Sequence, residues 1–289
     1  MKPILFTGVS TALVTPFLGG QINYPMMERL LQRQLECGIR SVVICGTTGE
    51  SPTLSDREKL TLFRRCKDFV GERMQIICGT GSNNTAHAVE LSVAAQETGA
   101  DALLVVTPYY NKANPEGLLA HYLSIANAVH IPIVLYNVPG RTGLDCPVSV
   151  YQQLSRVQNI AGVKEATTDI VKIAKTRYAC GEDLPIWSGN DDQAVAAMAL
   201  GAKGVISVLS NVKPAETTTM ALAALDGDFD TASALQCQML PLIEALFSEV
   251  NPIPIKAAMA LLGYDCGPCR LPLGAVSPNV RQRLEALLT

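Results

Sequence analysis

The 289-residue chain has few charged side chains, and this shortage excludes several classes of protein. Charged residues make up 17% and apolar residues 48% of the chain, which is too little charge for a disordered protein and enough apolar material for a large core. The net charge is −3 without a basic cluster, whereas nucleic-acid-binding proteins carry a basic patch. We therefore expect a globular protein with no nucleic-acid partner.

Long apolar runs are also absent from the sequence. No stretch approaches the roughly 18 apolar residues of a membrane span. The N-terminal apolar run stops at Thr7 and is too short for the core of a signal peptide. The nine cysteines are odd in number, and several, such as Cys45 and Cys78, lie in apolar runs, which is typical of buried reduced thiols. These features predict a cytoplasmic protein without a membrane segment.

Histidine is scarce, and this bears on metal binding. The three histidines are His87, His121 and His130, and none is near the CxxC motif of Cys266 and Cys269. A zinc site would need a second ligand pair, and a redox CxxC would follow a strand and open a helix. Neither condition is met, so the sequence predicts no metal site.

What the sequence does have is a series of short apolar runs separated by stretches with helical spacing. Continuous apolar runs are typical of strands buried on both faces, as in parallel sheets covered by helices. Glycines follow the helical stretches and mark short loops before the next run. The eight runs are Val9–Phe17, Ser41–Gly46, Gln75–Gly81, Ala102–Pro108, Ile131–Pro139, Ile160–Ala166, Pro185–Asn190 and Gly204–Ser210.

Eight alternating units predict an α/β fold, a (β/α)₈ TIM barrel. The alternative is an open doubly wound sheet, but such a sheet would have a glycine-rich phosphate loop after its first strand, and residues 15–17 (TPF) do not form one. From about Pro214 the pattern is helical to the end. We expect a barrel over residues 1–225 and a C-terminal helical region over residues 226–289 that packs on it.

Catalytic groups in such barrels lie at the carboxyl ends of the strands, and there Lys164 is the most informative residue. A lysine within an apolar strand is costly unless it is paired or neutral, and a desolvated neutral amine attacks carbonyl carbon. The alternative is a lysine that reaches solvent or pairs with Glu165. Tyr136 could move protons to and from such an adduct, or it could be an ordinary core aromatic.

Other strand ends add hydroxyl groups and a cation. Thr47 could relay a proton or merely cap a turn, and Tyr110 could complete the relay or be an interface aromatic. Arg141 could bind a substrate carboxylate with two parallel hydrogen bonds, or it could be a solvated surface charge. Each signal is weak alone, but together they place an amine, hydroxyl groups and a cation at one end of the barrel.

These residues lie in motifs that resemble the dihydrodipicolinate synthase family, whose wider membership includes N-acetylneuraminate lyase and sugar-acid aldolases. The resemblance runs in order along the whole chain. It implies a Schiff-base lyase that needs no cofactor and condenses pyruvate with L-aspartate-4-semialdehyde on the pathway to diaminopimelate and lysine. The motifs are GTTGES (46–51), TPYYNK (107–112), YNVPGRTG (136–143), GVKEA (162–166) and NPIPIK (251–256).

The resemblance also implies roles for individual residues. Lys164 would form the imine, and Tyr136, Thr47 and Tyr110 would relay protons, with Tyr110 reaching in from a neighbouring subunit of a tetramer built from tight dimers. Arg141 would bind the carboxylate of the second substrate and separate this activity from the sugar-acid aldolases. The residues implied for pyruvate binding are Thr48, Gly189 and Ile206.

Many family members are inhibited by lysine at the tight-dimer interface, and this chain departs from their pattern there. Ser51, Asn83 and Tyr109 match the family's lysine site. Asp56 and Lys59 stand where lysine-sensitive members have histidines, and His87 stands where they have a glutamate. Loss of that carboxylate removes a counter-charge and Lys59 adds a like charge, so we predict weak or no inhibition by lysine.

Two further hypotheses remain open from the sequence. A pyruvate-dependent aldolase acting on a sugar acid would depend much less on Arg141. A catalytically silent keto-acid sensor would be favoured if Lys164 or Tyr136 were missing, and both are present.

Overall fold

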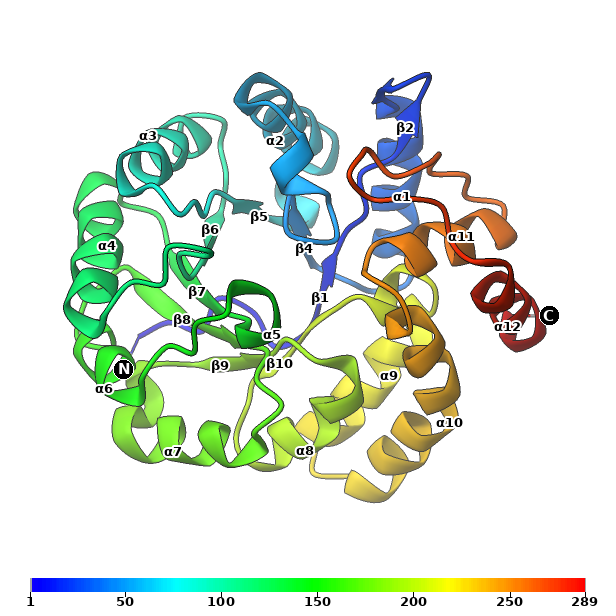
Figure 1. Cartoon of the computed structure of the whole chain (residues 1–289). Helices are drawn as coiled ribbons and strands as arrows, with labels where there is room; N and C mark the ends of the chain where they lie inside the picture. The colour runs from blue at the N-terminus through cyan, green and yellow to red at the C-terminus, as the bar shows by residue number, and fades with distance from the viewer. Residues whose placement is uncertain (1, 289) are drawn as a thin grey trace.

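The structure is a computed structural model that describes residues 2–288, and its centre is a closed barrel of parallel strands (Figure 1). Strands that follow one another along the chain are neighbours, and β1 pairs with both β4 and β10 to close the ring. The prediction of a (β/α)₈ barrel is confirmed. Its strands are β1 (Gly8–Ala12), β4 (Ser41–Ile44), β5 (Gln75–Gly79), β6 (Ala102–Val106), β7 (Ile133–Asn137), β8 (Ile160–Glu165), β9 (Ile186–Ser188) and β10 (Gly204–Ser207).

Helices cover the outside of the barrel, and polar side chains fix where several of them begin. Ser55 and Glu58 form a reciprocal capping box at the start of α2, and Asn84 and Asp169 accept backbone N–H groups at the starts of α3 and α7. The surrounding helices are α1 (Tyr24–Glu36), α2 (Asp56–Val70), α3 (Thr85–Gln96), α4 (Pro115–Ala128), α5 (Pro139–Thr142), α6 (Val148–Leu154), α7 (Ile170–Cys180), α8 (Ala194–Ala199) and α9 (Pro214–Leu225).

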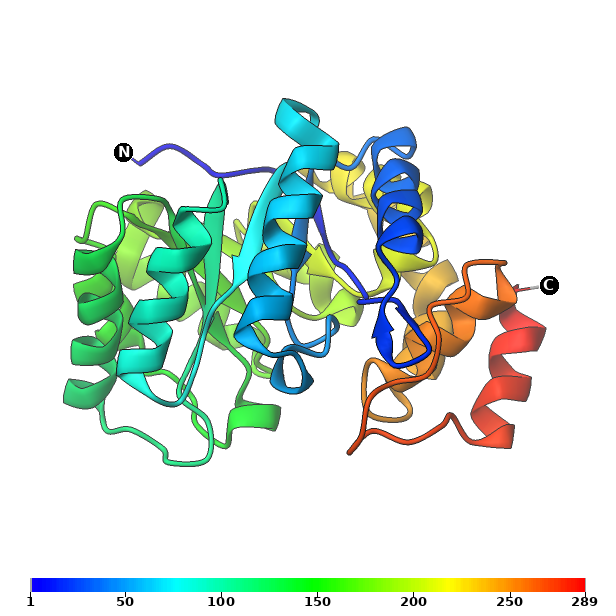
Figure 2. The same cartoon turned by 90° about the horizontal axis from the view of Figure 1, so that it is seen from above.

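The core has two parts. The larger part lies between the strands and the helices, and the smaller part fills the barrel interior. At the amino-terminal end of the barrel, Trp187 stacks on Phe6 at 4.8 Å between ring centroids and donates to its carbonyl at 3.1 Å. The N-terminal segment therefore closes that end of the barrel (Figure 2), and the carboxyl ends of the strands form the open end.

The C-terminal helices lie beside the barrel. In Figure 1, α10 (Phe229–Phe247) packs beside α9, whereas α11 (Ile253–Leu261) and α12 (Pro278–Leu288) lie on the side of α1. A buried ion pair between Lys256 and Glu50, 2.8 Å apart, joins α11 to the loop after β4. Arg270 adds an ion pair with Glu58 at 2.6 Å, and its guanidinium lies 4.4 Å from the ring centroid of Phe17. The division of the chain after residue 225 stays a prediction.

Some boundaries differ from the sequence-based expectation. The apolar run Val9–Phe17 is not one strand, because β1 ends at Ala12 and Phe17 begins a separate hairpin of β2 (Phe17–Leu18) and β3 (Gln21–Ile22). Arg141, expected in a loop, lies in the short helix α5, where Pro139 occupies the first turn. Short 3₁₀ turns occupy η1 (Ser51–Thr53), η2 (Gly71–Arg73), η3 (Gly181–Asp183), η4 (Asp191–Gln193) and η5 (Leu209–Asn211).

Within residues 2–288, no helix is both long enough and apolar enough to cross a bilayer.

Candidate active site

Lys164 lies on β8 and its side chain is 5% exposed, in the barrel interior. Its nearest functional neighbour is Tyr136, whose Cα pairs with that of Lys164 across β7 and β8. The Lys164 Nζ atom lies 4.4 Å from the centroid of the Tyr136 ring. The rival interpretation of Lys164, a surface lysine paired with Glu165, does not fit this placement, because the structure pairs Glu165 with Lys172.

The Lys164 side chain is confined from the side by Gly189, just after β9. A Cβ atom at Gly189 would lie 2.6 Å from the Cβ of Ala166 and 3.1 Å from the Cε of Lys164. Both distances are too short for ordinary contact, so glycine is required where the lysine methylenes pass. Ile206 is fully buried in the same interior cluster as Tyr136. The predicted residues Lys164, Tyr136, Gly189 and Ile206 thus share the barrel interior.

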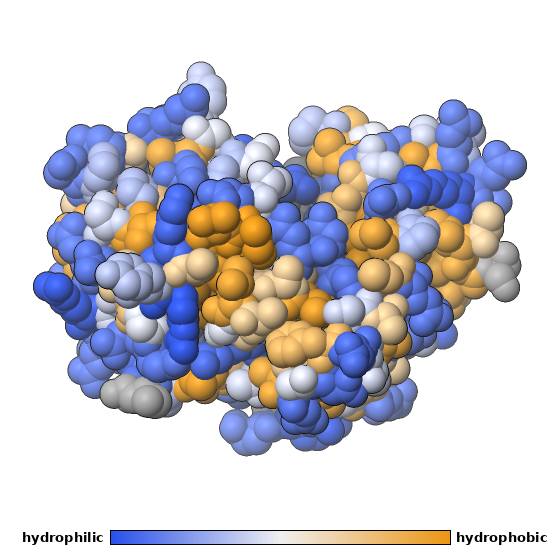
Figure 3. Space-filling model, turned by 90° about the horizontal axis from the view of Figure 1, so that it is seen from below, coloured by the Kyte–Doolittle hydropathy of each residue, from blue (hydrophilic) through white to orange (hydrophobic). Residues whose placement is uncertain are grey.

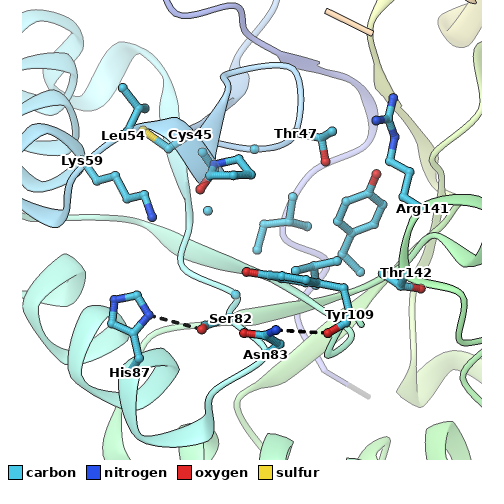
Figure 4. A pocket seen from close by; sticks show the side chains of 18 of the residues that line it. Cys45, Thr47, Leu54, Lys59, Ser82, Asn83, His87, Tyr109, Arg141 and Thr142 are labelled. Atoms are coloured by element: carbon cyan, nitrogen blue, oxygen red, sulfur yellow. Dashed lines mark hydrogen bonds between the residues drawn. The ribbon is translucent and has the colours of Figure 1, made fainter. Parts of the chain in front are cut away.

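A cavity of about 770 Å³ opens at the carboxyl ends of the strands, and Thr47, Tyr136 and Arg141 line it. In Figure 4, Thr47 and Arg141 lie on the side of this cavity away from His87. Thr48 is buried beside it and accepts a hydrogen bond of 2.9 Å from the Asn251 amide. The Arg141 guanidinium contacts the Asn251 carbonyl at 3.4 Å, so Asn251 links both predicted carboxylate-binding residues.

Two buried carboxylates stand near Lys164. Burial raises the pKa of the Asp191 carboxyl, while hydrogen bonds from the Val208 and Leu209 backbone, both at 2.9 Å, and the charge of the Lys164 amine oppose this shift. Burial also raises the pKa of Glu165, against the charge of Lys172. Glu165 follows Lys164 on β8, and neither carboxylate was among the residues predicted from the sequence to act in the site.

Tyr110 is the predicted relay residue that the single chain does not bring to the site. Its side chain is 91% exposed, and its backbone has φ +71°, a left-handed conformation that is strained for a residue with a Cβ. The neighbouring Tyr109 does line the cavity, and its carbonyl accepts a hydrogen bond of 3.2 Å from Asn83. Tyr110 therefore projects away from its own barrel.

The other end of the same cavity holds the predicted regulatory residues (Figure 4). His87 is paired through Nε2 with Asp56 at 2.8 Å, and its Nδ1 contacts the Ser82 hydroxyl at 3.2 Å. Lys59, which is almost fully buried, lies 3.8 Å from the other Asp56 oxygen. Ser51, Asn83 and Tyr109 also line the cavity.

Comparison with known proteins agrees with this geometry. A family model described as the dihydrodipicolinate synthetase family matches residues 5–289. The chain belongs to this family. The 4-hydroxy-tetrahydrodipicolinate synthase of Acetivibrio thermocellus is 46% identical over 273 residues, which cover 94% of this chain and 93% of that protein.

Solved structures of the family superpose closely on this chain. The chloride-inhibited dihydrodipicolinate synthase of Acinetobacter baumannii, complexed with pyruvate, has a TM-score of 0.96 and 39% identity, with 98% of each chain covered. The enzyme of Cyanidioschyzon merolae with lysine bound also has a TM-score of 0.96, at 38% identity, covering 99% of this chain and 98% of that one. The resemblance read from the sequence motifs is therefore confirmed at the level of the family.

The two cysteines of the CxxC motif are poor candidates for redox chemistry. Burial raises the pKa of Cys266 to about 12 and that of Cys269 to about 11, so both thiols stay protonated and unreactive near neutral pH. Among residues 2–288, no group of three or more His, Cys, Asp or Glu side chains is placed to hold a metal ion.

Sequence reasoning missed Asn251 as a site residue, although it opens the NPIPIK motif. The signal was present only as a resemblance, because nothing in the local pattern shows that an asparagine beyond the barrel folds back onto Thr48. It also treated Glu165 only as a possible partner of Lys164. The alternation of side chains along β8 could have shown that these two neighbours point to opposite faces of the barrel wall.

Proposed function

We propose that this chain is a 4-hydroxy-tetrahydrodipicolinate synthase, a lyase that condenses pyruvate with L-aspartate-4-semialdehyde through a Schiff base on Lys164. The observation that carries the proposal is the Lys164 amine in the apolar barrel interior, 4.4 Å from the ring of Tyr136 and below a cavity lined by Thr47 and Arg141. The names of the relatives support the same reaction.

In the first stage, the nitrogen of Lys164 attacks the C2 carbonyl of pyruvate through its lone pair and gives a carbinolamine. Protonation of its hydroxyl group allows water to leave and the imine to form. Tyr136 and Thr47 supply hydroxyl groups at the cavity for these transfers, since a hydroxyl both donates and accepts. Thr48, oriented by Asn251, donates to the pyruvate carboxylate, and Gly189 and Ile206 leave room for the bound pyruvate.

In the second stage, loss of a proton from C3 turns the imine into an enamine, which attacks the aldehyde carbon of the second substrate. The amino group of that substrate then attacks C2, which closes the ring and releases Lys164. Arg141 holds the carboxylate of the aldehyde at the cavity mouth in this scheme. A short aldehyde that carries a carboxylate needs a cation close to its reacting carbon, and Arg141 lines the same cavity as Thr47 and Tyr136.

The proposal includes a homo-oligomer, because the relay is incomplete within one chain. Tyr110 would enter the site of a second copy, which accounts for a 91% exposed aromatic on a left-handed backbone. A second contact is supported by the apolar face over α7 and α8 (Figure 3). Val171 and Tyr178 on α7 are 52% and 93% exposed there, which favours a tetramer made from tight dimers.

Borohydride trapping with pyruvate tests the proposal. We expect a pyruvate-derived adduct on the peptide that contains Lys164 and none in the Lys164→Ala variant. As a control, Lys67→Ala removes a lysine of the outer helix α2 that pairs with Asp101, and it should leave the adduct on Lys164 detectable. Folded wild-type protein that gives no adduct with excess pyruvate would remove the Schiff-base reaction and favour a silent keto-acid sensor.

A further inference from the structure

Directly behind the Lys164–Tyr136 pair, on the outer face of the barrel wall, lies a buried polar network. Asn137 follows Tyr136 on β7, Glu165 follows Lys164 on β8, and the Cα atoms of Asn137 and Glu165 are also paired. Because successive side chains of a strand point to opposite faces, Asn137 and Glu165 point outward when Tyr136 and Lys164 point inward. Both outward side chains are buried under the helices.

The two outward side chains are bonded to each other. The Asn137 amide donates to Glu165 Oε1 at 2.7 Å and to Asp145 Oδ1 at 2.8 Å, and its own oxygen accepts the Cys146 N–H at 3.0 Å. Both amide N–H groups and the carbonyl oxygen of the Asn137 side chain therefore have hydrogen-bond partners. The bond between Asn137 and Glu165 crosses from one strand to the next at the level of the reacting pair.

Both carboxylate oxygens of Glu165 accept hydrogen bonds. Oε1 also accepts the Thr167 N–H at 3.0 Å, and Oε2 accepts the Tyr151 hydroxyl at 2.9 Å. The Lys172 ammonium lies 3.6 Å from Oε2 and pairs with Asp145 as well. The network thus ties β7 and β8 to α6 and α7, and a buried carboxylate with this many donors has a single favourable position.

The backbone pairing of these strands is irregular lower down. Ile133 pairs with Ile160, but the next residue, Val134, pairs with Gly162, so β8 carries one extra residue. A one-residue slip would exchange the inward and outward faces of the strand. Such a slip would turn Lys164 out of the barrel and Glu165 into it, so the register above the irregularity decides whether the site exists.

We propose that Asn137 and Glu165 are positioning residues for imine formation. Their hydrogen bond fixes the register and spacing of the ends of β7 and β8 and so holds the Lys164 amine against Tyr136. The inference rests on the proposed function, because it concerns the rate at which Lys164 reacts with pyruvate. Neither residue touches the substrate in this account.

The test compares rates of pyruvate imine formation in folded protein, measured by borohydride quenching at saturating pyruvate. Asn137→Ala and Glu165→Ala remove the bond, and Glu165→Gln keeps an acceptor for Asn137. The matched control is Gln34→Ala on the opposite side of the barrel. Gln34 is also buried and hydrogen-bonded, accepting from Thr11 at 2.7 Å and donating to the Ser210 carbonyl at 3.1 Å.

We expect Asn137→Ala and Glu165→Ala to slow imine formation about 10- to 100-fold, because a misplacement of about 1 Å costs that much. Glu165→Gln should recover most of the rate. Gln34→Ala should form the imine at a rate within about twofold of wild type, since it leaves the reacting pair in place. This should hold even if its melting temperature falls as far as those of Asn137→Ala and Glu165→Ala. A purely structural role would instead make rate loss follow stability loss in all variants.

Equal imine rates in Asn137→Ala and Gln34→Ala would overturn the positioning role. If the alanine variants do not fold, Tyr151→Phe decides, because it removes one hydroxyl donor from Glu165 and keeps the ring. We then expect the rate of imine formation to fall about two- to tenfold, and a rate equal to that of wild type would overturn the proposal. Wild-type protein that forms no imine would mean failure of the proposed function, whereas wild-type rates in every variant would mean failure of the positioning role alone.

Discussion

At the scale of single residues, the site depends on which face of the barrel wall each side chain occupies. Lys164 and Tyr136 point into the barrel, while their neighbours Glu165 and Asn137 point out and are bonded to each other. A catalytic amine and a structural carboxylate can therefore be adjacent in sequence without forming an ion pair. In the proposed reaction, Arg141 binds the second substrate at the cavity mouth.

Arg141→Gln should separate the two substrates. The variant loses the cation for the aldehyde carboxylate, so kcat/KM for L-aspartate-4-semialdehyde should fall about 100-fold, as expected for losing a charged hydrogen bond of about 3 kcal/mol. Imine formation with pyruvate should change by less than about tenfold, because the reacting amine is untouched. Steady-state kinetics with each substrate varied, together with borohydride trapping, measure both effects.

The control for this prediction is Arg40→Gln. Arg40 is an exposed arginine in the loop before β4. Its guanidinium donates to the backbone carbonyls of Leu35 and Ile39. Its loss should leave both substrates unaffected. If Arg141→Gln keeps full activity toward the aldehyde, a sugar-acid aldolase becomes the better hypothesis.

Residues at the far end of the cavity predict a weak response to lysine. The Asp56 carboxylate could have replaced the missing glutamate, but it is already engaged by His87 and Lys59. An effector ammonium would have to displace one of these two partners of Asp56 and would lie near the Lys59 ammonium. Turnover should therefore be unchanged at lysine concentrations up to about 1 mM, a range in which a sensitive enzyme would bind its effector. Half-inhibition below that concentration would show that another group supplies the counter-charge.

At the scale of elements, the eight strands could be predicted because burial on both faces gives continuous apolar runs. The end of the first strand could not be predicted in this way. Phe17 is apolar and continues the run, but its backbone leaves the barrel to pair with Ile22. The same limit applies to the site. Strand ends could be located, whereas the Asn137–Glu165 bond and the contact of Asn251 with Thr48 depend on which segments meet in space.

The link between the C-terminal segment and α2 gives a prediction on stability. A hydrogen bond from Arg270, with further bonds from Ser55, lowers the pKa of Glu58 to about 2. Arg270→Met should lower the free energy of unfolding by about 1–2 kcal/mol at pH 7, since the pair is partly exposed and joins distant segments. Thermal unfolding followed by circular dichroism measures the loss.

The dependence on pH has a definite sign. A carboxyl whose pKa is lowered by folding stabilises the protein above its ordinary pKa of about 4.5, and the contribution disappears as the pH falls toward about 2. The difference between wild type and Arg270→Met should therefore shrink between pH 5 and pH 3. Arg283→Met, which breaks the exposed pair with Glu244, is the control and should cost less than about 0.5 kcal/mol at either pH. A difference independent of pH would assign the stabilisation to the contact of Arg270 with Phe17 instead.

At the scale of the whole molecule, the proposed proton relay needs a second copy of the chain. The cavity extends from the Arg141 end to the His87 end (Figure 4), whereas Tyr110, in the loop after β6, is 91% exposed and does not line it. An enzyme whose relay is completed by a second copy should lose activity on dissociation without losing its fold. This arrangement can be tested by mixing two inactive variants.

Tyr110→Phe and Lys164→Ala should each be strongly impaired alone but restore activity when mixed and allowed to exchange subunits. In a mixed dimer, one site combines the intact Lys164 of one chain with the intact Tyr110 of the other, so random pairing of equal amounts restores about a quarter of the sites. The control is Lys164→Ala mixed with Lys164→Arg, in which no site regains its lysine. If Tyr110 acted within its own chain, every mixed dimer would carry one defect per chain and the mixture would stay as inactive as its parts. Recovery of activity would therefore show both that the chains associate and that Tyr110 works across their interface.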